Sequence, residues 1–313
     1  MKRFLLILCC MAILLTCGCA GKQDKTSVQK ILIIGNSHSV DAFHLLYQAY
    51  ADLFPDVDLT LGVLYYSGCS ITKHVDFAQN DEPVYRYYKN TRGNWKIKKK
   101  VDMKTVLKDQ EWTTILLQAA KTDLDDTLNE PGRRALEAYV DQHVSTPHDF
   151  VWHTSWPSPN DENFFNENAE VTPPEGYKEN LENLYGFDPV NQYTVLTEKA
   201  KAHILTDETY PLAVCTGTAI MYAHLTEGCP QQDLWRDYTH LKDYGRLVAA
   251  YSMAVQLNGQ PTEAIGIDSI PAKLRHSRFE KEGDLILTDE MKQVLLRAAN
   301  YSLECPFSMP EKS

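Results

Sequence analysis

Residues 30–39 read Lys-Ile-Leu-Ile-Ile-Gly-Asn-Ser-His-Ser, and this stretch decides how the chain folds. A run of consecutive apolar residues, most of them β-branched, is typical of a central parallel strand that is buried on both faces. Gly35 and Asn36 end the run, and from Ser39 onward apolar residues recur at helical spacing. The pattern therefore predicts a strand that passes directly into a helix, with Ser37 in the turn between them.

The rest of the chain repeats this alternation of strand and helix. Further strands are expected at residues 58–65, 113–118, 150–154 and 212–215. Further helices are expected at residues 131–144, 191–205, 218–225, 244–257 and 289–301. Strands that alternate with helices indicate an α/β fold with a doubly wound parallel sheet. After the fourth strand, residues 156–190 are rich in Pro, Asn, Glu and aromatic residues, which indicates a long functional insertion.

The N-terminus has the features of an export signal. Residues 1–3 are Met-Lys-Arg, and the apolar run at residues 4–15 is too short to span a bilayer comfortably. Residues 15–20, Leu-Thr-Cys-Gly-Cys-Ala, resemble the lipobox of bacterial lipoproteins, in which a cysteine becomes the lipidated N-terminus. Cys19 fits that position best because a glycine precedes it, and Cys17 is the competing site. The alternative is an ordinary signal peptide with incidental cysteines.

The sequence accordingly divides into three segments. Residues 1–18 are expected to be a lipoprotein signal peptide, residues 19–29 a tether, and residues 30–313 a single catalytic domain with an insertion at about residues 156–190. A lipid anchor at Cys19 would hold the protein at a membrane of the cell envelope, on its periplasmic or its outer face, without a spanning helix.

The charge balance excludes nucleic acid as an expected partner. The formal net charge is −11, and it becomes −13 when residues 1–18 leave with two basic residues and no acidic one. Only residues 96–100 form a local basic cluster, which is expected to be a solvated loop or helix edge. No group of Cys and His residues has zinc spacing, so we expect no metal and no other cofactor. The remaining cysteines either pair as two disulfides or stay as buried thiols: Cys69, Cys215, Cys229 and Cys305.

Two separate parts of the chain carry the expected chemistry. Ser37 follows the first strand, where open α/β sheets bind ligands, and lies beside a helix N-terminus that can stabilise an oxyanion. A serine hydroxyl needs a histidine to accept its proton and a carboxylate to orient that histidine. Asp237 and His240 form a D-x-x-H immediately before a predicted helix, so both can project from one turn. The alternative is that Ser37 and Ser39 merely cap the helix, and Ser39 is expected to do so in either case.

The Gly-Asn-Ser-His-Ser stretch at residues 35–39 and the D-x-x-H near the C-terminal end together resemble the first and last motif blocks of the SGNH (GDSL-like) hydrolases. The resemblance covers about residues 30–257 and points to an uncharacterised lipoprotein branch in which Asn replaces the Asp of the G-D-S signature. It implies an SGNH/flavodoxin-like three-layer sandwich. It also implies that Ser37 is the nucleophile, His240 the general base and Asp237 the acid that orients the histidine.

The same resemblance implies an oxyanion hole with three donors. The backbone N–H of Ser37 is one, and Gly68 matches the glycine of the second block, although a simple turn glycine is the alternative. The third block is missing, because the family's G-x-N-D is replaced by residues 117–123, which contain no asparagine. Gln118 is expected to supply the amide instead, with Thr122 as the weaker candidate.

These residues predict a serine esterase that forms an acyl-enzyme. The resemblance implies a small acyl ester substrate, and we expect acetyl or similar groups on carbohydrate. The alternatives are a lipase-like or thioesterase-like SGNH hydrolase, and a non-catalytic glycan-binding surface lipoprotein with the same fold. His38 lies near the motif, and it is expected to be a structural group, with a place in the lining of the pocket as the alternative. Three tryptophans are expected to pack in the interior rather than stack on sugar rings: Trp152, Trp156 and Trp235.

Overall fold

The computed structural model describes residues 27–119, 130–166, 169, 171–229, 231–262, 266–274 and 284–312. Within them, a seven-stranded sheet has the order β4-β3-β2-β1-β5-β6-β7. Its strands are β1 (Ser27–Gly35), β2 (Val57–Tyr65), β3 (Tyr85–Thr91), β4 (Asn94–Val101), β5 (Thr114–Gln118), β6 (Asp149–Thr154) and β7 (Leu212–Cys215). The pairs β1–β2, β1–β5, β5–β6 and β6–β7 are parallel. The predicted α/β class with a mostly parallel central sheet is therefore confirmed.

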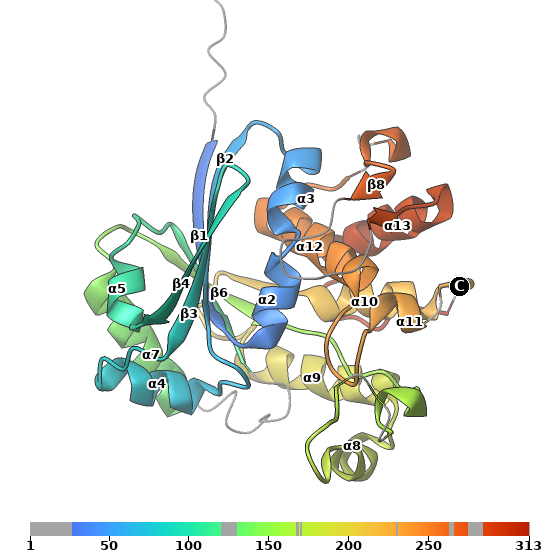
Figure 1. The fold of residues 1–313 in the computed structure, drawn as a ribbon, viewed down its shortest axis with the longest axis horizontal. Helices are drawn as coiled ribbons and strands as arrows, with labels where there is room; N and C mark the ends of the chain where they lie inside the picture. The colour runs from blue at the N-terminus through green and yellow to red at the C-terminus, as the bar shows by residue number, and fades with distance from the viewer. Residues whose placement is uncertain are drawn as a thin grey trace, which may run out of the picture.

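Helices cover both faces of this sheet and make a three-layer sandwich (Figure 1). One layer contains α4 (Ile71–Gln79), α5 (Met103–Leu107) and α7 (Glu130–His143). The other contains α2 (Ser37–Phe43), α3 (Leu46–Leu53), α10 (Thr216–Leu225), α12 (Asp243–Asn258) and α13 (Asp289–Glu304). The remaining elements are η1 (Glu162–Phe164), α8 (Tyr177–Tyr185), α9 (Pro189–His203), α11 (Gln231–Leu234), η2 (Ile267–Ser269), β8 (Lys273–Leu274) and β9 (Leu285–Ile286).

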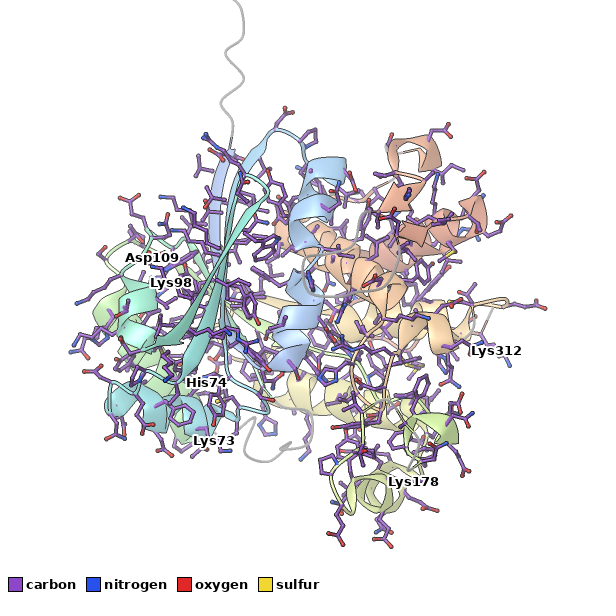
Figure 2. All side chains as sticks on the ribbon, viewed as in Figure 1. Lys73, His74, Lys98, Asp109, Lys178 and Lys312 are labelled. Carbon is purple, nitrogen blue, oxygen red and sulfur yellow. The ribbon has the colours of Figure 1, made fainter. Side chains whose placement is uncertain are left out.

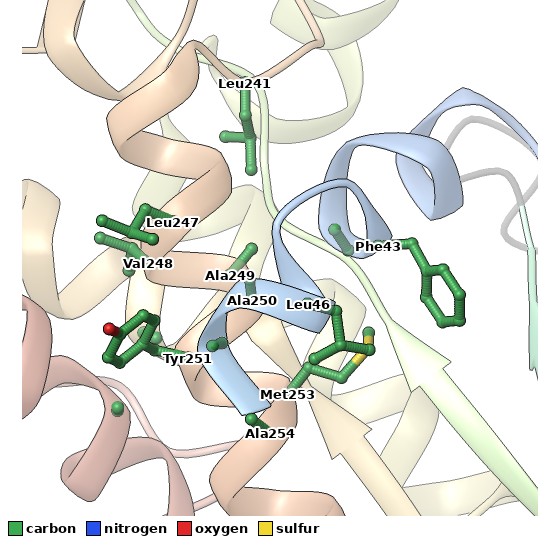
Figure 3. Close-up of a cluster of buried hydrophobic side chains, with 14 of the residues drawn as sticks. Phe43, Leu46, Leu241, Leu247, Val248, Ala249, Ala250, Tyr251, Met253 and Ala254 are labelled. Atoms are coloured by element: carbon green, nitrogen blue, oxygen red, sulfur yellow. The ribbon is translucent and has the colours of Figure 1, made fainter. Parts of the chain in front are cut away.

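Helix α12 is the centre of the larger hydrophobic core. All its residues from Tyr244 to Gln256 are buried, because α2 and α3 pack on one side of it and α10 and α13 on the other. Figure 3 shows Leu46 beside the alanines of α12, with Leu241 above them. Small residues such as Ala249 and Ala250 let the neighbouring helices approach closely. The loop that carries His240 is thus fixed directly to the core through Leu241.

Two strands at one edge of the sheet, β3 and β4, were not predicted from the sequence. Strands β3 and β4 form an antiparallel hairpin beside β2, joined by a turn in which Gly93 has a φ of +78°. The expectation that residues 96–100 form a loop or a helix edge is wrong, because they lie in β4, the edge strand. Lysines on an edge strand prevent further strands from pairing with it, which explains why so basic a segment is compatible with a sheet.

The expected helix after Ser37 is divided into α2 and α3, which are separated by His44 and Leu45.

The four cysteines of the described domain are free thiols. Among the described residues no helix is long and apolar enough to cross a bilayer. The predicted signal peptide, the lipidation candidates Cys17 and Cys19, and Thr122 lie outside the described residues.

Candidate active site

The turn after β1 places Ser37 at the first residue of α2. Asn36 caps the helix, and its Oδ1 accepts a hydrogen bond from the backbone N–H of His38 at 3.0 Å. The expectation that Ser39 caps the helix is therefore wrong: its buried hydroxyl donates to Oε1 of Gln118 at 2.8 Å. Gly35 is required here, because a Cβ on it would lie 2.1 Å from Oγ of Ser39.

Asp237 and His240 form a close pair in the loop before α12. Nδ1 of His240 lies 2.9 Å from Oδ2 and 3.0 Å from Oδ1 of Asp237. The backbone N–H groups of Thr239 and His240 also donate to Oδ1, at 2.9 and 2.8 Å. With Nδ1 bound to the carboxylate, the other ring nitrogen of His240 is left to accept a proton.

The environment of Asp237 favours its ionised form. Burial would raise the pKa of Asp237, but the hydrogen bonds from the His240 side chain and from the two backbone N–H groups outweigh that effect and hold the pKa below its usual value. The guanidinium of Arg236 adds a positive charge, with its Nε 3.6 Å from Oδ2 of Asp237. The carboxylate therefore stays negative at neutral pH and can stabilise a protonated His240.

A pocket of about 700 Å³ joins the two parts of the chain that carry these residues. Ser37, Gly68 and His240 all line it, although Ser37 and His240 lie more than two hundred positions apart in the sequence. The Ser37 hydroxyl makes no hydrogen bond with any other described residue, so it is available to a group that enters the pocket. The structure thus brings together the predicted nucleophile and the predicted base, with Asp237 buried directly behind the base.

Two backbone N–H groups at the pocket lack acceptors among the described residues, namely those of Ser37 and Gly68. Gly68 has a φ of +58°, and a Cβ there would meet nothing within 4 Å, so this turn is open toward the pocket. Nδ2 of Asn36 donates to the carbonyl of Cys69 at 3.4 Å and links the two turns. Such a pair of unpaired donors is the usual composition of an oxyanion hole.

Gln118 does not lie where the predicted third donor has to be. It is fully buried at the end of β5 and does not line the pocket. Its Oε1 accepts from the backbone N–H of Asn36 at 3.2 Å as well as from Ser39, and its Nε2 donates to the carbonyl of Ala119. Because both ends of the amide are bound beneath the turn, Gln118 holds the turn at Ser37 in place and does not reach into the pocket.

A buried ion pair, which the sequence analysis missed, connects the helix of Ser37 to the loop of His240. Oδ1 of Asp41 in α2 accepts from Nε and Nη2 of Arg246 at 3.0 and 2.8 Å. Its other oxygen accepts from the backbone N–H of Leu241 at 2.9 Å. Asp41 lies four residues after Ser37, which was the available signal, but its partners Leu241 and Arg246 are about two hundred residues away in the sequence.

His38 is also part of the pocket wall. Its ring nitrogens lie 3.0 Å from Oγ of Ser155 and 2.9 Å from Oγ1 of Thr239, and the ring stacks on Trp156 at 4.7 Å. The expectation that His38 is structural is thus consistent with its contacts, which hold the residue beside His240. The tryptophans pack in the interior as expected: Trp152, Trp156 and Trp235 are all buried.

The insertion lines the same pocket as Ser37 and His240. The lining residues from this segment are Pro174, Tyr177, Asn180, Leu181, Leu184 and Tyr185. The ring of Tyr177 lies 4.9 Å from that of Tyr238, the residue that follows Asp237, so the insertion packs on the D-x-x-H loop itself. Burial raises the pKa of Tyr177 to about 12, and its hydroxyl stays protonated at neutral pH as a hydrogen-bond donor.

The described residues contain no group of three or more His, Cys, Asp or Glu side chains that could hold a metal ion.

Comparison with known families finds a match to the family described as "Domain of unknown function (DUF4886)" over residues 30–266. A crystal structure of a DUF4886 family protein from Bacteroides uniformis ATCC 8492 is similar, with a TM-score of 0.70 and 22% sequence identity over 91% of this chain and 98% of that chain. That likeness shows a shared fold. Comparison with curated proteins finds no match.

Proposed function

The chain belongs to the DUF4886 family, and we propose that it is a serine esterase of the SGNH type. One observation carries the proposal: Ser37, with a hydroxyl that has no other described partner, lines the same pocket as His240, whose Nδ1 is held by Asp237 at 2.9 Å. A nucleophile, a base and an acid that orients the base are the set that serine hydrolysis requires.

The proposed reaction begins when Oγ of Ser37 attacks the carbonyl carbon of an ester and His240 accepts its proton. The N–H groups of Ser37 and Gly68 stabilise the negative oxygen of the tetrahedral intermediate. His240 then gives the proton to the leaving alcohol, and the acyl group remains on Ser37. A water molecule, deprotonated by His240, attacks this acyl-enzyme and releases the acid together with the free serine.

The composition of the pocket supports an uncharged substrate. Of the described residues that line it, none is Lys, Arg, Asp or Glu, and three are tyrosines: Tyr177, Tyr185 and Tyr238. Aromatic rings beside the amide of Asn180 combine a stacking surface with hydrogen-bonding groups, an arrangement that suits a sugar ring. A volume of about 700 Å³ exceeds what an acetyl group needs and leaves room for the alcohol part of the ester. We therefore propose small-acyl esters of carbohydrate as the substrates.

A longer acyl chain is the second candidate, because Leu184 lines the pocket while 65% of its surface is exposed. A lipase-like activity would use this apolar wall. The two proposals can be distinguished by comparing hydrolysis rates for esters of one alcohol with acyl chains of two to twelve carbons. A carbohydrate esterase should hydrolyse the acetyl ester fastest, whereas a lipase-like enzyme should hydrolyse the longer-chain esters fastest.

The test of the proposal is reaction with a fluorophosphonate probe together with hydrolysis of an aryl acetate. The native protein should be labelled once and should turn over the ester, and Ser37→Ala should do neither. Ser67→Ala is the matched control, because Ser67 is an exposed serine in the same pocket and should keep both properties. A folded native protein that binds acetylated glycans without labelling or turnover would instead be the glycan-binding lipoprotein, and the esterase proposal would be abandoned.

A further inference from the structure

Gln192 contributes a buried amide to the wall of the pocket that holds Ser37. It lies in the first turn of α9, and only 3% of its surface is exposed. Its Oε1 accepts a hydrogen bond from the backbone N–H of Ser158 at 2.6 Å. Since a backbone N–H can only donate, this contact fixes which end of the amide is oxygen and which is nitrogen. Nε2 makes no hydrogen bond with any described residue, so Gln192 keeps a free donor at the pocket.

The other buried polar side chains that line the pocket are already bonded to described residues. Both ends of the Asn36 amide are bound, because Oδ1 accepts from the backbone N–H of His38 and Nδ2 donates to the carbonyl of Cys69. Nε2 of His38 lies 2.9 Å from Oγ1 of Thr239. A buried donor without an acceptor is costly, and proteins seldom keep one without a reason. The free NH2 group of Gln192 therefore indicates that an acceptor enters the pocket.

The size of the surrounding space indicates where that acceptor comes from. A second hollow beside Gln192 has a volume of only about 10 Å³, which is enough for one water molecule at most. The pocket that also contains Ser37 and His240 has a volume of about 700 Å³ and admits a small molecule. An acceptor that belongs to a substrate therefore has to approach Gln192 from the pocket of Ser37.

A chain of contacts connects Gln192 to the loop that carries the proposed base. Ser158, which holds the amide, has its Oγ 3.3 Å from the hydroxyl of Tyr177. The ring of Tyr177 lies 4.9 Å from that of Tyr238, which is two residues before His240. In the proposed reaction His240 protonates the leaving alcohol, so the alcohol part of the ester lies next to this loop. Gln192 is thus placed to contact the alcohol part.

Recognition at this wall uses uncharged groups. Lys178 follows Tyr177 in the insertion, but its Nζ pairs with Glu162 at 3.3 Å, and Figure 2 labels it on α8. Of the described residues that line the pocket, none is Lys, Arg, Asp or Glu. A neutral NH2 group favours a neutral oxygen, such as the hydroxyl or the ring oxygen of a sugar, and gains nothing from the methylene groups of an apolar alcohol.

From these observations we propose that Gln192 is a specificity-determining residue, whose NH2 group donates a hydrogen bond to a hydroxyl or ring oxygen in the alcohol part of the ester. The inference rests on the proposed esterase function and identifies the alcohol as an oxygen-bearing ring. An ester whose alcohol lacks such an oxygen leaves Nε2 unpaired in the complex and is hydrolysed more slowly. Gln192 takes no part in bond making or breaking, so it acts on the choice of substrate.

The test compares two kinds of acetate with the same ring size, namely a set of monoacetylated methyl hexosides and cyclohexyl acetate. The native protein should have the higher kcat/KM for the best hexoside. Gln192→Met keeps the length of the side chain but removes the donor. It should lower kcat/KM for that hexoside about tenfold and leave kcat/KM for cyclohexyl acetate within about twofold of the native value. If the methionine variant does not fold, Gln192→Glu replaces it, because its carboxylate still offers an acceptor to the N–H of Ser158.

Gln256→Met is the matched control. Gln256 is also buried, and its Oε1 accepts from the backbone N–H of Cys215 at 3.0 Å, but its Nε2 donates to Oγ of Ser252 at 2.8 Å and it does not line the pocket. The control should lower stability without altering the ratio of the two kcat/KM values. The proposal would be overturned by a native protein that hydrolyses cyclohexyl acetate as fast as every hexoside, or by equal losses on both esters in Gln192→Met.

A binding measurement separates this inference from the esterase proposal. In the Ser37→Ala protein, calorimetry gives the affinity for the acetylated hexoside without hydrolysis, and adding Gln192→Met should weaken that affinity about tenfold. If the native protein hydrolyses neither ester but its hexoside affinity depends on Gln192, the esterase proposal fails and the role of Gln192 stands. Hydrolysis that requires Ser37 but is indifferent to Gln192 gives the opposite result. The absence of both hydrolysis and binding would overturn both.

Discussion

The backbone N–H of Leu241 donates a hydrogen bond of 2.9 Å to Oδ2 of Asp41. This contact joins the residue after His240 to the helix that begins with Ser37, so one carboxylate holds the two halves of the site together. Its other oxygen is bound to Arg246, whose side chain is 3% exposed. The relative position of Ser37 and His240 thus depends on a residue that contacts no substrate.

Asp41→Ala should be strongly destabilising, because it leaves the buried guanidinium of Arg246 without its main partner. We expect a loss of about 3–5 kcal/mol in the free energy of unfolding, measured by urea titration. Lys178→Ala removes a partner from an exposed ion pair with Glu162 and should leave the unfolding midpoint nearly unchanged. A similar small effect of Asp41→Ala would mean that the buried pair does not hold the loop.

Ser37 and His240 should behave as one unit. Ser37→Ala and His240→Ala should each lower kcat on an aryl acetate by several decades, and the double variant should cost little more. Asp237→Asn should be less severe, since the histidine remains but loses the partner that orients it. If the two single losses simply multiplied in the double variant, Ser37 and His240 would be acting independently and the triad would be wrong.

Gln118 provides a test of the nucleophile turn. Gln118→Ala leaves the Asn36 N–H and the Ser39 hydroxyl without their buried acceptor, which should cost about 1–3 kcal/mol of stability. A direct oxyanion donor would behave differently, because its loss lowers turnover by about two to three decades. Unfolding and turnover are measured on the same preparation. A large loss of turnover with unchanged stability would restore the amide to the oxyanion hole.

Asp207 should make the domain sensitive to acid. Burial would raise the pKa of Asp207, but hydrogen bonds from Arg134 and Arg133 outweigh it and lower the pKa to about 2. Because the folded pKa lies below the unfolded value, this stabilisation is complete above about pH 4 and is lost as the pH falls toward 2. Asp207→Asn should flatten the decrease in unfolding free energy over that interval. An unchanged slope would place the acid sensitivity elsewhere.

Cys19 should be the lipidated N-terminus of the mature protein. Cys19→Ala should release the protein from the membrane fraction or leave it unprocessed, and Cys17→Ala should do neither. Mass spectrometry of the N-terminal peptide identifies the first residue of the mature protein and shows whether it carries lipid. A mature N-terminus at another residue, without lipid, would contradict the lipobox.

The local patterns were sufficient for the parallel strands of the sheet and for the two motif turns. The apolar run before Gly35 forms β1, and the periodic segment after residue 243 forms α12, because each is long and its burial pattern matches one kind of element. Asp237 and His240 are three residues apart, so their contact is a property of a single turn. The antiparallel hairpin was missed because its lysines resemble a solvated loop when the neighbouring β2 is not considered.

Local sequence patterns were enough to predict the α/β class, the position of Ser37 at a strand-to-helix turn, and the pairing of Asp237 with His240. The contacts of Gln118 beneath the turn, the bond between Asp41 and Leu241, and the part of the pocket lined by the insertion became visible only in the folded chain. The difference lies in the sequence distance over which each interaction acts. Periodicity and turn chemistry act over a few residues, whereas these contacts join positions 82 and 200 apart and arise only when the helices pack on the sheet.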